Sequence, residues 1–106
     1  MKFNQWLENI NNRVNNDAVR TLQQAKDRIG QYSSMDFRAA TDADAMLRGV
    51  RGFLRIANGV QVDQEMIFNL TRLANNCNHL SHLDPQKKEK INQIQADIDG
   101  LISKLQ

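Results

Sequence analysis

Apolar residues recur along this chain every three or four positions, which is the period of an amphipathic α-helix. The first stripe consists of Phe3, Leu7, Ile10, Val14, Ala18, Leu22, Ala25 and Ile29. The segment Asn15-Asn16-Asp17 interrupts this stripe with poor helix formers that are also good N-caps. We therefore predict two helices, over residues 3–15 and 17–29, with Gly30 as the C-cap of the second. One continuous helix is the alternative.

A connector is predicted over residues 31–41, where Ser and Asp favour turns. Its two large apolar residues, Met35 and Phe37, are expected to fold back onto the core. Thr41 has the features of an N-cap, because an acidic residue follows three positions later. The helix that it begins is predicted to run until Gly59 ends it.

Asp63 is predicted to cap the next helix, over residues 63–83, with Val62 before it as half of a hydrophobic staple. The buried stripe of this helix consists of Met66, Leu70, Leu73, Cys77 and Leu80. Asp84 and Pro85 are expected to end this helix and to begin another, since proline is favoured at the first helical position.

The last apolar stripe consists of Ile91, Ile94, Ile98, Leu101 and Leu105. Its alternating spacing of three and four is that of a coiled-coil seam. Short connectors between all of these helices favour antiparallel neighbours. The sequence thus predicts an all-α fold, a compact antiparallel bundle of four or five helices that forms one domain over residues 1–106.

Composition agrees with a globular domain, since 41% of the 106 residues are apolar and 25% are charged. A net charge of +2 is too small to indicate a nucleic-acid binder, and a single Cys excludes an intrachain disulfide framework. No run approaches about 18 consecutive apolar residues, and the N-terminus has no apolar signal region. We expect a cytoplasmic protein without a membrane partner.

Three arginines give the helix after Thr41 its charge. At 100° per residue, Arg48, Arg51 and Arg55 share one face, in a narrow wedge with Asp44. Because a guanidinium group matches phosphate and carboxylate geometry, we predict a face that binds an anion or an acidic partner. The alternative is an ordinary solvated edge.

The same helix carries a small-residue surface made of Ala45, Gly49 and Gly52. Each glycine costs about 1 kcal/mol against alanine inside a helix, so close approach of another backbone or of a ligand should offset that cost. Tight packing within the chain is one interpretation. Self-association, as a symmetric dimer through this surface, is the other.

A third candidate surface lies opposite the buried stripe of the 63–83 helix. It consists of Phe68, Arg72, Asn75, His79 and His82. Aromatic and arginine side chains are enriched at interaction hot spots, so we predict a partner-binding stripe. The alternative is that Phe68 packs beneath the connector or the N-terminal helix, and that the other side chains are plain surface.

Catalytic chemistry has no candidate in this sequence. It contains no Gly-rich phosphate loop, nucleophile elbow or zinc-protease helix motif. Cys77 should point into the core while His79 and His82 point outward, so these three residues would not converge on a metal ion. We expect neither an enzyme nor a cofactor.

Our first hypothesis is a small non-catalytic binding protein, an adaptor, inhibitor or assembly factor that binds another protein. The second is nucleic-acid or nucleotide binding through the arginine face. The third is a structural subunit whose last helix continues a coiled coil with a partner.

Overall fold

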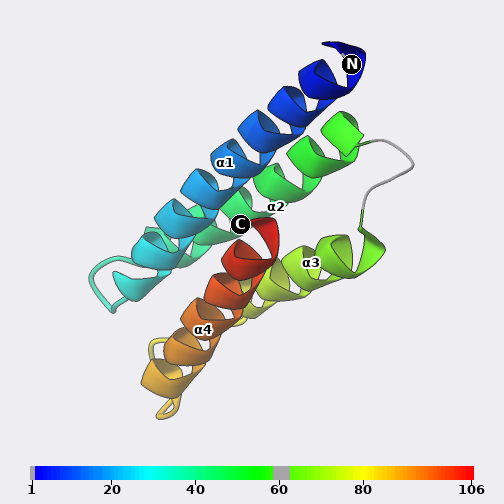
Figure 1. Cartoon of the computed structure of the whole chain (residues 1–106). Helices are drawn as coiled ribbons and strands as arrows, with labels where there is room; N and C mark the ends of the chain where they lie inside the picture. Colours follow the sequence, from blue (N-terminus) through cyan, green and yellow to red (C-terminus); the bar gives the residue numbers. More distant parts are fainter. Residues whose placement is uncertain (1, 59–62) are drawn as a thin grey trace.

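The computed structural model describes residues 2–58 and 63–106, with side chains for residues 13–57 and 63–106. Its helices are α1 (Lys2–Gly30), α2 (Arg38–Asn58), α3 (Gln64–Asn78) and α4 (Lys87–Leu105) (Figure 1). The all-helical prediction is confirmed, and the described part holds four helices rather than five. The molecule measures 56 × 20 × 19 Å along its principal axes.

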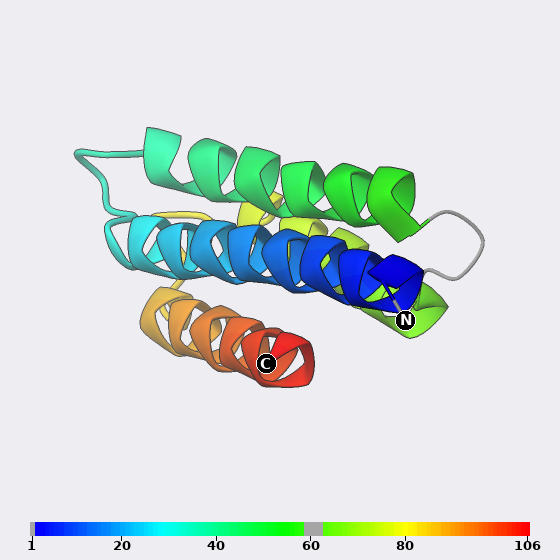
Figure 2. The ribbon, with the colours of Figure 1, turned by 45° about the horizontal axis from the view of Figure 1, so that its top comes forward.

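The helices are arranged around one core. Figures 1 and 2 show α1 and α2 side by side, with α4 against α1 and α3 against α2. Among the pairs of neighbouring helices, α3 and α4 have the smallest contact. Two ion pairs bridge them, Arg72 to Asp97 at 3.5 Å and Lys104 to Glu65 at 3.7 Å.

Helix α1 is continuous, so the prediction of two helices is wrong and the alternative holds. Val14, Ala18 and Leu22 are all buried, and they lie on both sides of the Asn-Asn-Asp segment. Burial of one unbroken apolar stripe outweighs the weak helix propensity of that segment. The side chains of the earlier stripe residues Phe3, Leu7 and Ile10 lie outside the described residues.

Helix α2 begins three residues before the predicted cap, so Thr41 is inside the helix and not its N-cap. Ala39 and Ala40 are already buried, which extends the apolar face of α2 toward its start. Gly59 and Val62, predicted as a helix stop and as half of a staple, lie outside the described residues.

The connector between α1 and α2 is fixed by two sets of contacts. The buried Tyr32 donates a hydrogen bond from its hydroxyl to the carbonyl oxygen of Leu80, at 3.3 Å. Arg28 bonds the carboxylate of Asp36 at 2.7 and 3.2 Å, and that of Asp42 at 2.9 Å. These contacts tie the connector to α1, to α2 and to the segment between α3 and α4.

Helix α3 begins as predicted, because Asp63 Oδ1 accepts from the backbone amides of Glu65 at 3.0 Å and Met66 at 3.3 Å. It ends at Asn78, five residues before the predicted end, with His79 as its C-cap.

Helix α4 begins at Lys87, two residues after the predicted start at Pro85. Asp84 Oδ1 accepts from the backbone amide of Gln86 at 2.8 Å, so Asp84 caps a turn that precedes the helix. The predicted role of this residue as the helix cap is therefore wrong.

The coiled-coil stripe of α4 is part of the protein's own core. Four of its five residues are buried, and Leu105 packs against the core from its edge. Ile102, which the predicted stripe omitted, is buried as well. The seam therefore packs within the chain, which removes the basis of the structural-subunit hypothesis.

In the described part of the chain, no helix combines the length and the apolar content needed to cross a bilayer.

Candidate functional site

A polar network along the α2–α3 seam joins two of the predicted surfaces. Arg48 donates from Nε to Asp44 Oδ1 at 2.7 Å and from Nη2 to Asn75 Oδ1 at 2.7 Å. Asn78 donates from Nδ2 to the other oxygen of Asp44 at 2.6 Å. Arg48 and Asn75 were predicted to serve separate sites, but here they hold α2 and α3 together.

The other two arginines of α2 are in different surroundings. Arg51 donates from Nη1 to Thr71 Oγ1 at 3.0 Å, and that hydroxyl donates in turn to the carbonyl oxygen of Ile67 at 3.1 Å. Arg55 is exposed. Neither arginine has an acidic partner among residues 13–57 and 63–106. The arginine face therefore retains two guanidinium groups that no carboxylate of the described part neutralises.

Phe68 projects from the outer side of α3, where its side chain is 67% exposed. The interpretation that it packs beneath the connector or the N-terminal helix is wrong. Arg72, one helical turn further along, reaches across to Asp97 of α4 at 3.5 Å while remaining partly exposed. Phe68 and Arg72 thus stay on one accessible surface.

The two histidines of the predicted stripe are not on the helical face, because α3 ends before them. His79 lines a groove of about 290 Å³ between α3 and α4, together with Leu80, Lys90 and Ile94. His82 packs against Phe37 of the other connector, with ring centroids 4.9 Å apart and planes tilted by 49°. The five residues therefore do not form a single surface, since their environments differ.

The small-residue surface of α2 is open. A Cβ atom built on Gly49 or on Gly52 would meet no atom within 4 Å in the described part, and Ala45 is exposed. The described residues therefore give these two glycines no tightly packed neighbour. A shallow groove of about 310 Å³ lies beside them, lined by Asp17, Ala18, Thr21, Met46, Gly49, Val50 and Phe53.

The structure also shows an apolar surface that sequence reasoning missed. Met35 is 95% exposed, Phe37 is 51% exposed and Leu83 is 80% exposed. Met35 and Phe37 were expected to cover the core, and that prediction is wrong. The two connectors that carry these residues meet at one end of the bundle (Figure 1), through the Phe37–His82 contact. We call Met35, Phe37 and Leu83 the connector tip.

A sequence signal for the connector tip existed. Large apolar residues inside segments rich in Ser, Asp and Pro have no helical stripe to join. Such residues are either buried by a neighbouring element or left exposed. The sequence alone does not decide between these outcomes, because the answer depends on where the connectors lie.

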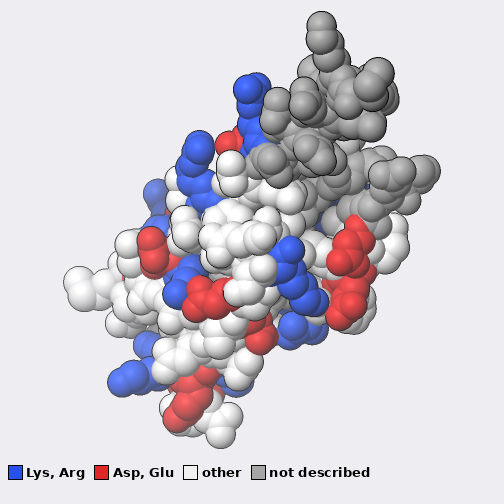
Figure 3. Space-filling model, in the orientation of Figure 1, with Lys and Arg blue, Asp and Glu red and all other residues white. Residues whose placement is uncertain are grey.

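The side chains with reactive chemistry are dispersed. Cys77 is buried, and burial raises the pKa of its thiol to about 12. No three His, Cys, Asp or Glu side chains gather as metal ligands within the part of the chain that the structure describes. On the face shown in Figure 3, basic and acidic side chains are interspersed rather than separated.

No family model, curated protein or solved structure matches this chain.

Proposed function

We propose that this chain is a cytoplasmic, non-catalytic binding protein, built as an antiparallel four-helix bundle, that acts by stoichiometric contact with another protein. The contact is assigned to a surface made of Phe68, Arg72, Arg51 and Arg55, which we call the Phe68 patch. The observation that carries this proposal is the exposure of Phe68.

Phe68 contributes little to folding, in contrast to the other large apolar residues of α3. Met66, Leu70 and Leu73 are buried in the core, whereas Phe68 is 67% exposed. Burying a phenylalanine side chain stabilises by about 1.5–3 kcal/mol, and most of that free energy is unused in the isolated chain. A partner that covers the Phe68 ring would gain that free energy on binding.

The arginines of the patch are positioned by the register between α2 and α3. Arg48 meets Asn75 and Arg51 meets Thr71, so the arginine face of α2 runs along α3 in the direction of Phe68. An exposed aromatic ring with arginines on the same helix and on the neighbouring helix is a composition typical of interaction hot spots. The hydrogen bond from Arg51 to Thr71 also reduces the conformational entropy that Arg51 would lose on binding.

Photo-crosslinking in the native host tests the proposal. A photoreactive phenylalanine analogue at position 68 is expected to give a discrete adduct with one protein. The same analogue at Gln24, which is exposed on α1, serves as the matched control. Identical adducts from both positions would contradict the proposal.

The captured protein is then titrated with purified variants. Phe68→Ser is expected to weaken binding about 30-fold, the effect of a hot-spot residue worth about 2 kcal/mol. Arg55→Gln should weaken it less. Thermal unfolding should be unchanged for both variants, because both side chains are exposed. Unchanged affinity of Phe68→Ser would refute the assignment of the patch.

Nucleic-acid binding is the second candidate function, and the observation that favours it is the lack of acidic partners at Arg51 and Arg55. Binding of labelled DNA or RNA should then weaken steeply with salt, because phosphate contacts release counterions. Replacing Arg48, Arg51 and Arg55 with Gln should abolish it. Absence of binding at micromolar protein and low salt would reject this candidate.

Self-association through Ala45, Gly49 and Gly52 is a secondary proposal, supported by the open space over both glycines. Sedimentation at increasing concentration should show a dimer, and Gly49→Leu should shift it toward monomer by filling the surface. A monomer at all concentrations would remove this proposal.

A further inference from the structure

The positive charge of this protein is concentrated in one stretch of the chain. Residues 45–62 contain Arg48, Arg51 and Arg55 and no acidic residue, which is a charge of +3. The whole chain carries +2, so all other residues together carry −1. Arg48 and Arg51 donate hydrogen bonds to side chains of α3, so this charge lies along the seam between α2 and α3.

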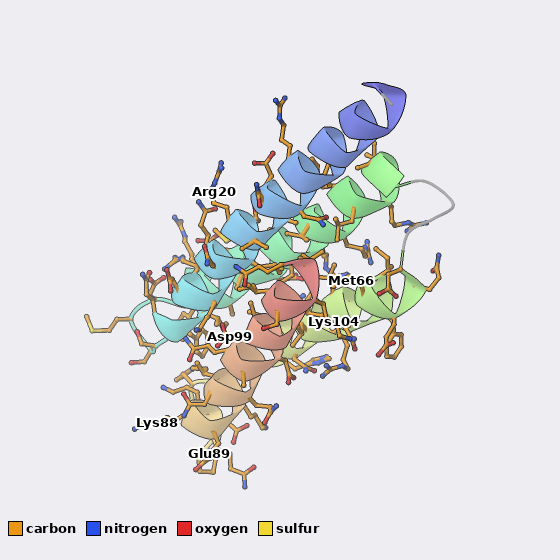
Figure 4. The ribbon with its side chains drawn as sticks, viewed as in Figure 1. Arg20, Met66, Lys88, Glu89, Asp99 and Lys104 are labelled. Atoms are coloured by element: carbon orange, nitrogen blue, oxygen red, sulfur yellow. The ribbon has the colours of Figure 1, made fainter. Side chains whose placement is uncertain are left out.

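The charges on the opposite side of α3, which faces α4, cancel in pairs. Arg72 lies 3.5 Å from Asp97 of α4. Lys104, near the end of α4 (Figure 4), lies 3.7 Å from Glu65. Each cation of this side therefore has a carboxylate partner within the bundle.

The charges on the side of α3 that faces α2 do not cancel. Asp44 is the carboxylate of this seam, and Arg48 already bonds it at 2.7 Å. Arg51 and Arg55 have no acidic partner in the described part of the chain. The side chains of α3 that bond these groups are all uncharged, namely Thr71, Asn75 and Asn78.

The uncompensated charge lies on the same flank of α3 as the exposed ring. Thr71 lies three residues after Phe68, so their side chains are neighbours on the helix surface. Arg51 donates to Thr71 at 3.0 Å, and this bond anchors its guanidinium group at a position next to Phe68 on α3.

This positive strip is short and has carboxylates at both ends. Arg48 and Arg55 are seven residues apart, which is about 10 Å along a helix. Asp44 lies before the strip. Later residues of α2 meet earlier residues of α3, so Asp63 and Glu65 at the start of α3 lie toward the other end.

A short acidic segment suits this strip better than a nucleic acid does. A long strand would continue past the arginines toward these carboxylates. Affinity for a nucleic acid also grows with the number of phosphate contacts, so two guanidinium groups supply little of it at physiological salt.

We propose that the protein bound at the Phe68 patch presents a short acidic segment, with carboxylates on Arg51 and Arg55 and an apolar side chain over Phe68. This inference rests on the proposed function, since it names the chemistry of the partner at the same surface. Guanidinium groups bind carboxylates through paired, charge-assisted hydrogen bonds. Complementary charge also selects the partner and speeds its association.

A peptide titration followed by NMR of the full chain tests the proposal. The probe is a short peptide in which glutamates flank a pair of leucines, and its match carries lysines in place of the glutamates. The acidic peptide is expected to shift the Nε resonances of Arg51 and Arg55 and the ring resonances of Phe68. Added salt should weaken its binding, because screening acts on exposed charges. The lysine peptide should leave all of these resonances unchanged.

Variants connect the binding to the residues. Arg51→Gln and Arg55→Gln should each weaken binding of the acidic peptide about threefold, as expected for partly exposed ion pairs. The two together should weaken it about tenfold. Arg13→Gln is the matched control, because Arg13 is exposed on α1, and it should bind the peptide as the unmodified chain does. Circular dichroism confirms that each variant is folded.

Failure of this proposal can be distinguished from failure of the Phe68 patch. The patch stands and the acidic segment is rejected if the adduct formed at position 68 maps to a partner segment without acidic residues. The same holds if the Arg51→Gln and Arg55→Gln pair binds the acidic peptide normally while Phe68→Ser does not. Unchanged binding by Phe68→Ser rejects the patch itself.

Two further results would overturn the proposal. The first is the absence of any shift with the acidic peptide at millimolar concentration and low salt. The second is tighter binding of single-stranded oligothymidylate than of the acidic peptide, which would assign the arginines to a nucleic acid.

Discussion

Replacing Gly49 and Gly52 with alanine should stabilise the monomer of this protein. Both glycines lie inside α2, and a Cβ atom at either position meets no atom within 4 Å in the described part of the chain. The substitutions therefore add no clash with the described residues. They remove backbone freedom from the unfolded chain, which is the main reason that glycine weakens helices.

The expected gain follows from helix propensity. Each replacement is worth about 1 kcal/mol, so the pair should raise the free energy of unfolding by about 2 kcal/mol. A chain of 106 residues has an unfolding entropy of about 0.22 kcal/mol/K, which converts the gain into a rise in Tm of about 9 °C. Thermal and urea denaturation followed by circular dichroism would measure both quantities.

Two further glycines provide controls. Gly100→Ala in α4 also enters open space and should stabilise by about 1 kcal/mol. Gly30→Ala should not stabilise, because its Cβ would lie 2.7 Å from Nε2 of Gln95. That amide donates to the carbonyl oxygen of Lys26 at 3.1 Å, so displacing it loses a hydrogen bond worth about 1 kcal/mol.

One pattern of results would refute this reasoning. If the pair Gly49→Ala and Gly52→Ala lowers Tm while Gly100→Ala raises it, the surface of α2 is not open in the native protein. A dependence of that loss on protein concentration would show that a second copy of the chain occupies the surface.

Three other predictions concern the core and the charged groups. Ile98→Ala should lower the free energy of unfolding, measured by urea denaturation, by about 2–5 kcal/mol, because Ile98 is fully buried. A near-normal free energy of unfolding would contradict the packing of the α4 stripe inside the chain. Asp63→Ala should lower the free energy of unfolding by about 1 kcal/mol, because the N-cap of α3 is lost. Asp63→Asn should retain most of that stability, since an asparagine side chain accepts the same amide hydrogen bonds as aspartate does. Arg28 lowers the pKa of Asp36 below its ordinary value of 3.8, as Lys90 does for Asp84. A carboxylate whose pKa is lower in the folded state stabilises the folded protein at pH values above its unfolded-state pKa. The urea midpoint should therefore fall as pH drops below about 3.8. A rising midpoint would contradict these ion pairs.

Local sequence features predicted the structure correctly where helical periodicity or a helix cap alone decided it. Apolar stripes and capping residues placed helices in the four regions where the structure has them, although residues 3–29 were divided into two helices. The Asp63 cap was confirmed, because a side chain two or three residues from an amide needs no tertiary support. The helix boundaries were less well predicted. Burial of Ala39 and Ala40 extends α2 past its expected cap, and packing carries α1 through Asn15–Asp17.

The candidate surfaces depended on tertiary structure. Helical spacing placed Arg48 and Asn75 correctly on their own helices, but only the packing of α3 on α2 brought them together. The end of α3 at Asn78 separated His79 and His82 from the stripe to which spacing assigned them.

The sequence alone established the helical class, the apolar stripes that supply most of the core and several candidate side chains for binding. Tertiary structure decided which of those side chains are used inside the bundle and which remain outside it. Exposure is the result of packing between elements distant in sequence, and no local pattern encodes it. Met35 illustrates the point, because the hydrogen bond from Tyr32 to Leu80 fixes the connector whose outer side carries it.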